Sequence, residues 1–187
     1  MAECLLNGGV VSFPTDTVYG IGGKIDDLEA LEKIYIIKKR PNDKRLAVLC
    51  GSLEEIERIA YVNDNALKLI DKFMPGALTI ILKSKEEIRN DYIHETIAVR
   101  IPNHELALRI LNENGAMATS SVNISGSKPL NDYIEIVEKF NNEVLCIYPN
   151  VEIPSKVSST IIDLSGDECT LIRDGSIKFS EILKAIE

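Results

Sequence analysis

Several residue types are rare or missing in this chain of 187 residues. It has no tryptophan, only 5% aromatic residues and just two histidines, His94 and His104. The two histidines form no H-x-x-x-H pattern, which argues against a zinc site. No apolar run approaches the roughly 20 residues that a membrane span requires, so a transmembrane helix is not expected.

Closely spaced cysteines are also missing. The four cysteines, Cys4, Cys50, Cys146 and Cys169, lie far apart and form no C-x-x-C pair. We interpret them as reduced thiols, mostly in the core of a cytosolic protein. Residues 1–4 contain no basic segment followed by an apolar stretch, so we expect no secretory signal and a cytoplasmic location.

Positive charge is in the minority, with 21 Lys and Arg against 29 Asp and Glu and a net charge of −8. This balance argues against a protein whose main task is to grip a nucleic-acid backbone, which favours a basic face. It leaves room for a local basic pocket, because a small anionic ligand needs only a few cations. The chain also lacks the G-x-x-x-x-G-K-[ST] of an ordinary P-loop and the G-x-S-x-G of esterases.

Short β-like runs alternate with helical patterns along the whole chain. Strands are expected at residues 10–13, 46–50, 78–82, 97–101, 116–119, 144–147, 160–164 and 170–173. Helices are expected at residues 26–39, after Ser52, at 63–73, at 105–112, at 131–140 and from about Ser180, with Asp26, Ser52 and either Asn131 or Asp132 as N-caps. This pattern and length predict one α/β domain over residues 1–187, with a twisted, mixed, open sheet flanked by helices.

The most informative stretch is residues 13–20, which read F-P-T-D-T-V-Y-G. A strand that ends at a proline and continues into small polar side chains places hydroxyl groups on a loop at a strand end. Open α/β sheets bind their ligands at such positions. An ordinary strand-to-helix turn is the alternative for this stretch taken alone.

Residues 38–41 read K-K-R-P, so that three cations end a helix and Pro41 prevents its continuation; Lys44 and Arg45 follow. Cations at a helix C-terminus complement the helix dipole, and this purely structural role is one reading. The other is a polyphosphate site near Thr15, because arginine and lysine both bind phosphate oxygens.

Residues 99–104 read V-R-I-P-N-H and place Arg100 inside an apolar strand. A buried arginine must be paired or hydrogen-bonded, whereas an arginine on an edge strand could face water. We expect His104 to begin a helix rather than to act as a base. Residues 75–79, P-G-A-L-T, predict a turn into a strand.

Residues 119–126 read T-S-S-V-N-I-S-G, a dense set of hydroxyl and amide groups after a buried strand. Such a loop can hold phosphates or a ribose, although a locally capped turn has the same composition. Residues 158–163 (S-S-T-I-I-D) and 171–175 (L-I-R-D-G) each pair small polar or charged groups with a strand.

These segments, taken in order, resemble the threonylcarbamoyl-AMP synthase family of YrdC-like proteins. The resemblance rests on P-T-D-T-V-Y-G, K-x-R-P, P-G-x-L-T, V-R-I-P-x-H, S-x-N-x-S-G, S-S-T-I-I-D and I-R-D-G-S-I, and it runs from about Val10 to Ile177. It is the short, single-domain form that the chain resembles. The family fold is implied: a twisted α/β sheet with a deep, positively charged cavity on one side.

The resemblance also implies roles for particular residues. The implied ATP-binding residues are Lys38, Arg40, Ser121, Asn123, Ser159 and Arg173, of which Lys38 and Arg40 are the catalytic pair. The implied threonine-binding residues are Thr15, Thr119 and Arg40, and Lys44 is an additional cation. No metal ligand in the chain is implied; Mg²⁺ is expected to arrive with ATP, held by phosphates and water.

The implied reaction condenses L-threonine, bicarbonate or CO2 and ATP to threonylcarbamoyl-AMP and pyrophosphate. The adenylate then serves formation of threonylcarbamoyl-adenosine at position 37 of tRNAs that read ANN codons, with tRNA bound directly or through downstream transfer proteins. Two alternatives remain open from the residues. One is a module that binds tRNA or double-stranded RNA, and the other is a carbamoyl-adenylate-handling domain related to hydrogenase maturation, against which the missing C-x-x-C pairs count.

Overall fold

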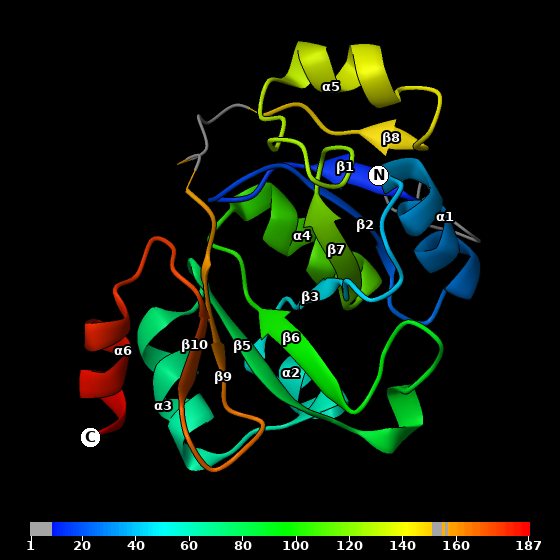
Figure 1. The fold of residues 1–187 in the computed structure, drawn as a ribbon. Helices are drawn as coiled ribbons and strands as arrows, with labels where there is room; N and C mark the ends of the chain where they lie inside the picture. Colours follow the sequence, from blue (N-terminus) through cyan, green and yellow to red (C-terminus); the bar gives the residue numbers. More distant parts are fainter. Residues whose placement is uncertain (1–8, 151–154, 156) are drawn as a thin grey trace.

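A mixed β-sheet forms the framework of the chain (Figure 1). The computed structural model describes residues 9–150, 155 and 157–187. The strands of the sheet follow the order β10-β9-β5-β6-β3-β7-β2-β1-β8, and β4 pairs with β5 outside this path. The strands are β1 (Val11–Phe13), β2 (Gly20–Lys24), β3 (Ala47–Leu49), β4 (Ala60–Tyr61), β5 (Leu78–Ser84), β6 (Thr96–Arg100), β7 (Met117–Ser121), β8 (Cys146–Ile147), β9 (Thr160–Asp163) and β10 (Thr170–Arg173).

The predicted mixed character of the sheet is confirmed. Strand β1 runs parallel to β8, β3 parallel to β6, and β5 parallel to β9, while the remaining neighbours are antiparallel. Every predicted strand is present with slightly different ends. The sheet is mixed because it contains two kinds of neighbours. Some are consecutive antiparallel strands, such as β5 and β6, and others are parallel strands joined through helices, such as β3 and β6.

Strand β2 is a central strand that the sequence did not predict. Its sequence G-I-G-G-K is rich in glycine, which is normally depleted in strands. The tertiary structure explains the exception, since a Cβ on Gly22 would lie 2.6 Å from Cγ2 of Thr119 on β7. Glycine therefore lets β2 and β7 pack closely beneath the site described below.

The helices begin near their predicted N-caps. They are α1 (Leu28–Lys38), α2 (Leu53–Ile59), α3 (Asp64–Phe73), α4 (Glu105–Asn114), α5 (Tyr133–Phe140) and α6 (Phe179–Ile186), with a short 3-10 turn at Glu86–Ile88. Ser52 and Asp132 cap α2 and α5 as predicted. The prediction of Asp26 as the cap of α1 was wrong by one residue: Asp27 is the last extended residue, and its carboxylate accepts a hydrogen bond from Ala30 N at 3.0 Å.

The apolar faces of the helices pack against the sheet and against one another. In Figure 1, α3 and α6 lie together beside the β9–β10 end, α1 packs on β2, and α5 lies beside β8 at the opposite end. Cys50 is fully buried, and Cys146 and Cys169 are half-buried and packed against the core; Cys4 lies outside the described residues. None of the described helices combines the length and apolar character needed to cross a membrane.

Candidate active site

A polar pocket of about 260 Å³ lies on one face of the sheet. Its lining residues come from both ends of the chain: Thr15, Thr17, Val18, Tyr19, Gly20, Arg40, Arg45, Ala47, Leu49, Thr79, Arg100, Thr119, Ser120, Ser121, Ser158, Ser159, Ile161 and Arg173. Several pairs are two residues apart on one strand, such as Thr119 with Ser121 and Ala47 with Leu49. This spacing places their side chains on the same face of the sheet.

The loop after β1 forms one wall of the pocket, as predicted. The Thr15 hydroxyl donates to Val18 O at 2.7 Å and accepts from Thr17 N at 3.2 Å and Val18 N at 3.3 Å. These bonds close a tight turn whose backbone groups would otherwise be unsatisfied. Thr15 therefore shapes the loop and at the same time presents its remaining surface to the pocket.

Arg100 fastens this loop to the sheet. It lies on β6, an interior strand, and is only 6% exposed, so the edge-strand alternative was wrong. Its guanidinium donates to Asp16 Oδ1 at 2.5 Å, to Thr17 Oγ1 at 2.8 Å and to Gly76 O at 2.8 Å. Burial lowers the pKa of Arg100, and the neighbouring Asp16 carboxylate partly offsets that effect.

Arg40 reaches the pocket from the end of α1. The helix ends because Lys39 adopts a left-handed conformation, with φ of 48°. The Arg40 guanidinium then donates to Lys44 O at 2.9 Å, Arg45 O at 2.7 Å and Ser120 Oγ at 3.4 Å. Burial lowers the pKa of Arg40, and Tyr35 and the Asp43 carboxylate partly offset that effect.

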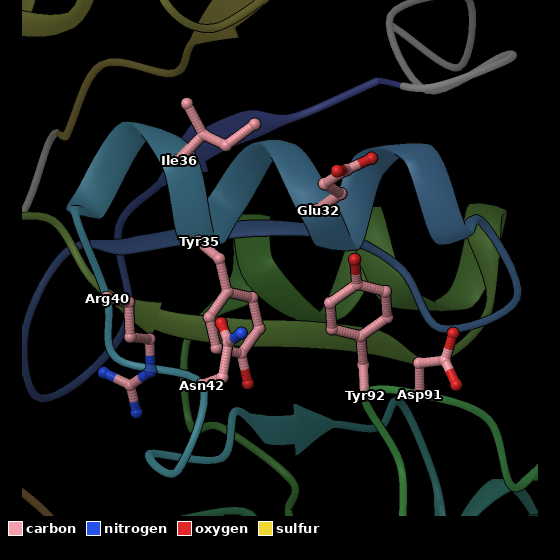
Figure 2. Close-up of a pocket in the computed structure, with 7 residues that line it drawn as sticks. All are labelled: Glu32, Tyr35, Ile36, Arg40, Asn42, Asp91 and Tyr92. Atoms are coloured by element: carbon pink, nitrogen blue, oxygen red, sulfur yellow. The ribbon is translucent and has the colours of Figure 1, made fainter.

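A second hollow lies on the other side of Arg40. Figure 2 shows Arg40 at one end of it, beside Tyr35 and Asn42, with Tyr92 and Asp91 at the far end. The Tyr35 hydroxyl donates to Lys44 O at 3.0 Å, the same carbonyl that accepts from Arg40. The tyrosine therefore helps to fix the turn that orients the arginine toward the polar pocket.

Arg173 closes the pocket from β10. Its Nη2 donates to Ser159 O at 2.8 Å and to Ser159 Oγ at 3.1 Å, and Ser159 Oγ lies 2.8 Å from Thr79 Oγ1. Burial lowers the pKa of Arg173, and the charge of Arg100 lowers it further. Two guanidinium groups that repel one another in this way leave a positive field in the pocket.

The charges on the pocket wall are all of one sign. Among the described residues that line it, four are arginines (Arg40, Arg45, Arg100 and Arg173) and none is an aspartate or glutamate. Within the described part of the chain, Arg100 is the one arginine of the four that forms an ion pair with a carboxylate, that of Asp16. Since clustered arginines without paired carboxylates favour a bound anion, the pocket is suited to a ligand that carries several negative charges.

An apolar pocket of about 200 Å³ adjoins the polar one and shares Arg45, Ala47 and Ile161 with it. Its other lining residues are mainly aliphatic or aromatic: Leu46, Val48, Ile81, Tyr92, Ile93, Thr96, Ile97, Ala98, Ala118 and Ile172. A polar pocket beside an apolar one matches a ligand with an anionic part and a flat apolar part.

The structure brings most of the predicted site residues together. Six line the polar pocket: Thr15, Arg40, Thr119, Ser121, Ser159 and Arg173. Two do not, since Lys38 is 1% exposed and Asn123 is 7% exposed behind the wall. Lys44 is exposed and lies outside the lining as well. Direct contact of each of these residues with a ligand stays a prediction.

The sequence analysis missed Arg100, Thr17, Thr79 and Arg45 as site residues. For Arg100 the signal was present, because an arginine within an apolar strand requires a partner. Thr79 was assigned to a turn into a strand, and nothing local indicates that it meets Ser159, which is 80 residues away. Ser120 and Ser121 were expected in a loop but belong to the end of β7.

We expect Gly175→Ala to disrupt the Arg173 side of the pocket. A Cβ at this position would lie 2.4 Å from Thr160 N and 2.5 Å from Ser158 O, which are backbone atoms and cannot move aside individually. The strand start that holds Ser159 would have to shift, so nucleotide affinity should fall at least tenfold. Calorimetric titration with ATP checks this. Gly166→Ala, where a Cβ meets nothing within 4 Å, is the matched control, and equal affinities in the two variants would refute the expectation.

Comparisons with known proteins agree with this fold. A threonylcarbamoyl-AMP synthase of Pyrococcus abyssi is 35% identical over 189 residues, covering 99% of this chain and 56% of the relative. A threonylcarbamoyl-AMP synthase of Bacillus subtilis is 32% identical over 186 residues, covering 97% of this chain and 54% of the relative. The crystal structure of P. abyssi Sua5 complexed with L-threonine superposes with a TM-score of 0.93 at 34% identity, covering 99% of this chain and 56% of that one.

The chain thus spans about half the length of these relatives. The model of one protein family, Sua5/YciO/YrdC, described as "Telomere recombination", matches residues 3–175. That match covers most of the chain and includes the segments that form the polar pocket. The chain belongs to the Sua5/YciO/YrdC family, as the order of its motifs predicted.

Proposed function

We propose that this protein is an L-threonylcarbamoyladenylate synthase, a nucleotidyltransferase that condenses L-threonine, bicarbonate or CO2 and ATP. The observation that carries the proposal is a pocket whose described lining has four arginines and no carboxylate, directly beside an apolar pocket. The relatives named threonylcarbamoyl-AMP synthase, and the Sua5 structure complexed with L-threonine, support the same reading.

In this proposal the phosphates of ATP lie in the polar pocket near Arg40 and Arg173. Among the described residues, the guanidinium groups of these two arginines donate to carbonyl or hydroxyl oxygens and to no carboxylate, which favours an additional bond to a phosphate. The adenine base would occupy the apolar pocket, whose aliphatic walls suit a flat ring.

The threonine substrate is proposed to lie against the loop after β1 and against β7. Thr15 and Thr119 line the pocket there, and the Thr119 hydroxyl donates to Ala47 O at 3.3 Å. Because that hydroxyl is directed to the strand, its methyl group is the part available to a small aliphatic side chain. Arg40, which also lines the pocket, would bind the carboxylate of threonine.

The proposed reaction needs no covalent intermediate with the protein. The threonine amine attacks CO2 and releases a proton, or attacks bicarbonate and releases water. Either route gives a carbamate. A carbamate oxygen then attacks the α-phosphorus of ATP, the bond to the β-phosphate oxygen breaks, and pyrophosphate leaves. Arg40 and Arg173 would stabilise the charge that develops on the transferring and leaving phosphates, and the pocket holds the reactants in line.

Mg²⁺ is proposed to enter as part of the ATP complex. Within the described part of the chain, no group of three or more His, Cys, Asp or Glu residues lies together as a metal site. Magnesium commonly keeps several waters and binds through substrate phosphates, so a dedicated protein cage is not required. The role of the chain in this step is limited to holding the phosphates.

We further propose that the adenylate is used to form threonylcarbamoyl-adenosine at position 37 of tRNAs that read ANN codons, in the cytoplasm. The net charge of −8 favours transfer through other proteins over tight direct binding of tRNA.

The decisive experiment follows adenylate formation with labelled bicarbonate. Purified protein, ATP and Mg²⁺ are incubated with L-threonine, L-serine or L-valine, and pyrophosphate and labelled adenylate are measured. We expect threonine to exceed serine by about 10–200-fold, because a methyl group is worth only about 1–3 kcal/mol. Valine should be rejected by roughly 10⁴-fold if a site group bonds the hydroxyl.

Two results would contradict the proposal. Nucleotide binding without a threonine-dependent product would indicate that the protein is a binding module and not a synthase. In that case, tRNA binding with a steep salt dependence would identify RNA as its ligand. Product from carbamoyl phosphate instead of bicarbonate would identify a carbamoyl-adenylate-handling domain.

A further inference from the structure

Lys38 is the last residue of α1, and its ammonium group points away from solvent into the wall behind the polar pocket. It is 1% exposed, yet among the described residues its hydrogen-bond partners are carbonyl and amide oxygens and not carboxylates. Its Nζ donates to Ser121 O, to Asn123 O at 2.8 Å and to Asn123 Oδ1 at 2.9 Å. An ammonium group has three protons, and these three oxygens accept all of them.

Both polar atoms of the Asn123 amide are hydrogen-bonded, as is the ammonium group of Lys38. Its amide oxygen accepts from Lys38 Nζ and from Ser121 Oγ, the latter at 2.7 Å, and its amide nitrogen donates to Ile124 O at 3.0 Å and Ser127 O at 2.6 Å. The backbone adds a further hydrogen bond, from Ser125 N to Lys38 O at 2.7 Å. The segment 121–127 is therefore tied to the end of α1 by both the side chain and the carbonyl of one lysine.

We propose that Lys38 is a positioning residue that acts through Asn123 and Ser121, and that it makes no contact with the phosphates of the nucleotide. A phosphate contact would require the ammonium group to give up one of its three buried acceptors and leave that oxygen unsatisfied, which is unfavourable. Arg40, two residues on, reaches the pocket because the left-handed Lys39 turns the chain between them.

The lysine also determines which hydrogen bonds Ser121 can offer to a ligand. An ammonium group can only donate, so it fixes the Asn123 amide with its oxygen toward Lys38. That oxygen can only accept, so the Ser121 hydroxyl must donate to it. The hydroxyl therefore presents lone pairs to the pocket, and it accepts from an N–H or O–H group of the substrate instead of donating to a phosphate oxygen.

The inference concerns the same site as the proposed function, and its consequence for substrate rests on that function. Its first test does not depend on activity. Amide hydrogen exchange of the ligand-free protein is measured for Lys38→Met, which keeps an unbranched side chain only one atom shorter and removes all three donors. We expect exchange in residues 121–127 to accelerate at least tenfold, while β5 and β6 stay protected.

The second test compares the affinities of adenosine, AMP and ATP in the absence of threonine. A residue that touches no phosphate should, when replaced, weaken all three ligands by the same factor, within about threefold. A lysine that binds a phosphate would instead weaken AMP or ATP far more than adenosine. Ile56→Val, which removes one buried methyl group on α2, controls for lost stability and should leave all three affinities unchanged.

Lys39→Asn is the matched control for charge, because it removes a neighbouring cation and asparagine tolerates the left-handed conformation. If Lys38→Met does not fold, Asn123→Ala provides the same two readouts with the lysine intact. A double-mutant cycle between Lys38→Met and Asn123→Ala should show strong non-additivity, since both break one network.

Unchanged exchange in residues 121–127, or a loss of ATP or AMP affinity at least tenfold greater than the loss of adenosine affinity, overturns the proposal. A wild-type protein that binds no nucleotide would refute the proposed function, while the exchange measurement would still decide the role of Lys38 in holding the segment.

Discussion

Arg40→Ala is expected to lower the rate of adenylate formation by about 10²–10³-fold, the loss found when one preorganised electrostatic donor is removed from an active site. Arg40 reaches the polar pocket with a guanidinium held in place by Lys44 O, Arg45 O and Ser120 Oγ. These partners are all uncharged, and among the described residues Arg40 forms no ion pair, although the nearby Asp43 carboxylate partly offsets its charge. Pyrophosphate release with threonine, bicarbonate and ATP as substrates is the measurement.

The fold should survive this substitution. Arg40 lies at a helix end near the surface, and its hydrogen bonds fix a short turn, so we expect the melting temperature to fall by no more than about 4 °C, equivalent to about 1 kcal/mol. Arg40→Lys should recover only part of the rate, because lysine keeps the charge without the planar, multiple donors. Arg58→Ala, at the exposed end of α2, is the control. Near-normal turnover in Arg40→Ala would remove this residue from the proposed mechanism.

Arg100→Met is expected to lower the free energy of unfolding by about 3–5 kcal/mol, more than the other substitutions. It breaks a buried ion pair and leaves the Asp16 carboxylate without its cation. The Arg100 side chain is 7% exposed and that of Asp16 is 18% exposed. Thr17 Oγ1 and Gly76 O lose a donor in the same substitution. For a chain of this length we expect the melting temperature to fall by roughly 6–20 °C.

The control for Arg100 is a surface pair of the same type. Arg109 and Glu105 lie 3.0 Å apart on α4 with side chains 48% and 90% exposed, and Arg109→Met should cost less than about 1 kcal/mol. Asp16→Asn introduced into Arg100→Met should restore part of the stability, because it removes the carboxylate that was left unpaired. If Arg100→Met and Arg109→Met melt at the same temperature, the pair Arg100–Asp16 does not anchor the loop.

The sequence predicted most of the elements because their local signals agree with the tertiary structure. The apolar run before Pro14 is a strand, and Ser52 and Asp132 cap the helices that follow them. Strand β2 escaped prediction because glycine disfavours strands locally, and its glycines are explained only by the approach of Thr119 from β7. The cap of α1 moved from Asp26 to Asp27, a shift within the precision of helix ends.

Site residues were predictable to the extent that they lie in segments with an unusual density of polar groups. Thr15, Ser121 and Arg173 belong to such segments, and all three line the pocket. Thr79 was missed because its importance comes from Ser159, which the parallel pairing of β5 with β9 brings beside it. No local pattern reports a contact of this kind.

By itself the sequence determined the alternation of helices and strands, the family and the identity of the groups available for chemistry, since these follow from residue types and their order along the chain. Only the tertiary structure decided which way each group points. Lys38 and Arg40 are both cations at the end of one helix, yet one is buried against Asn123 and the other lines the pocket. The physical reason is that a buried ammonium group is stable only where three acceptors surround it, and those acceptors come from a segment more than 80 residues away.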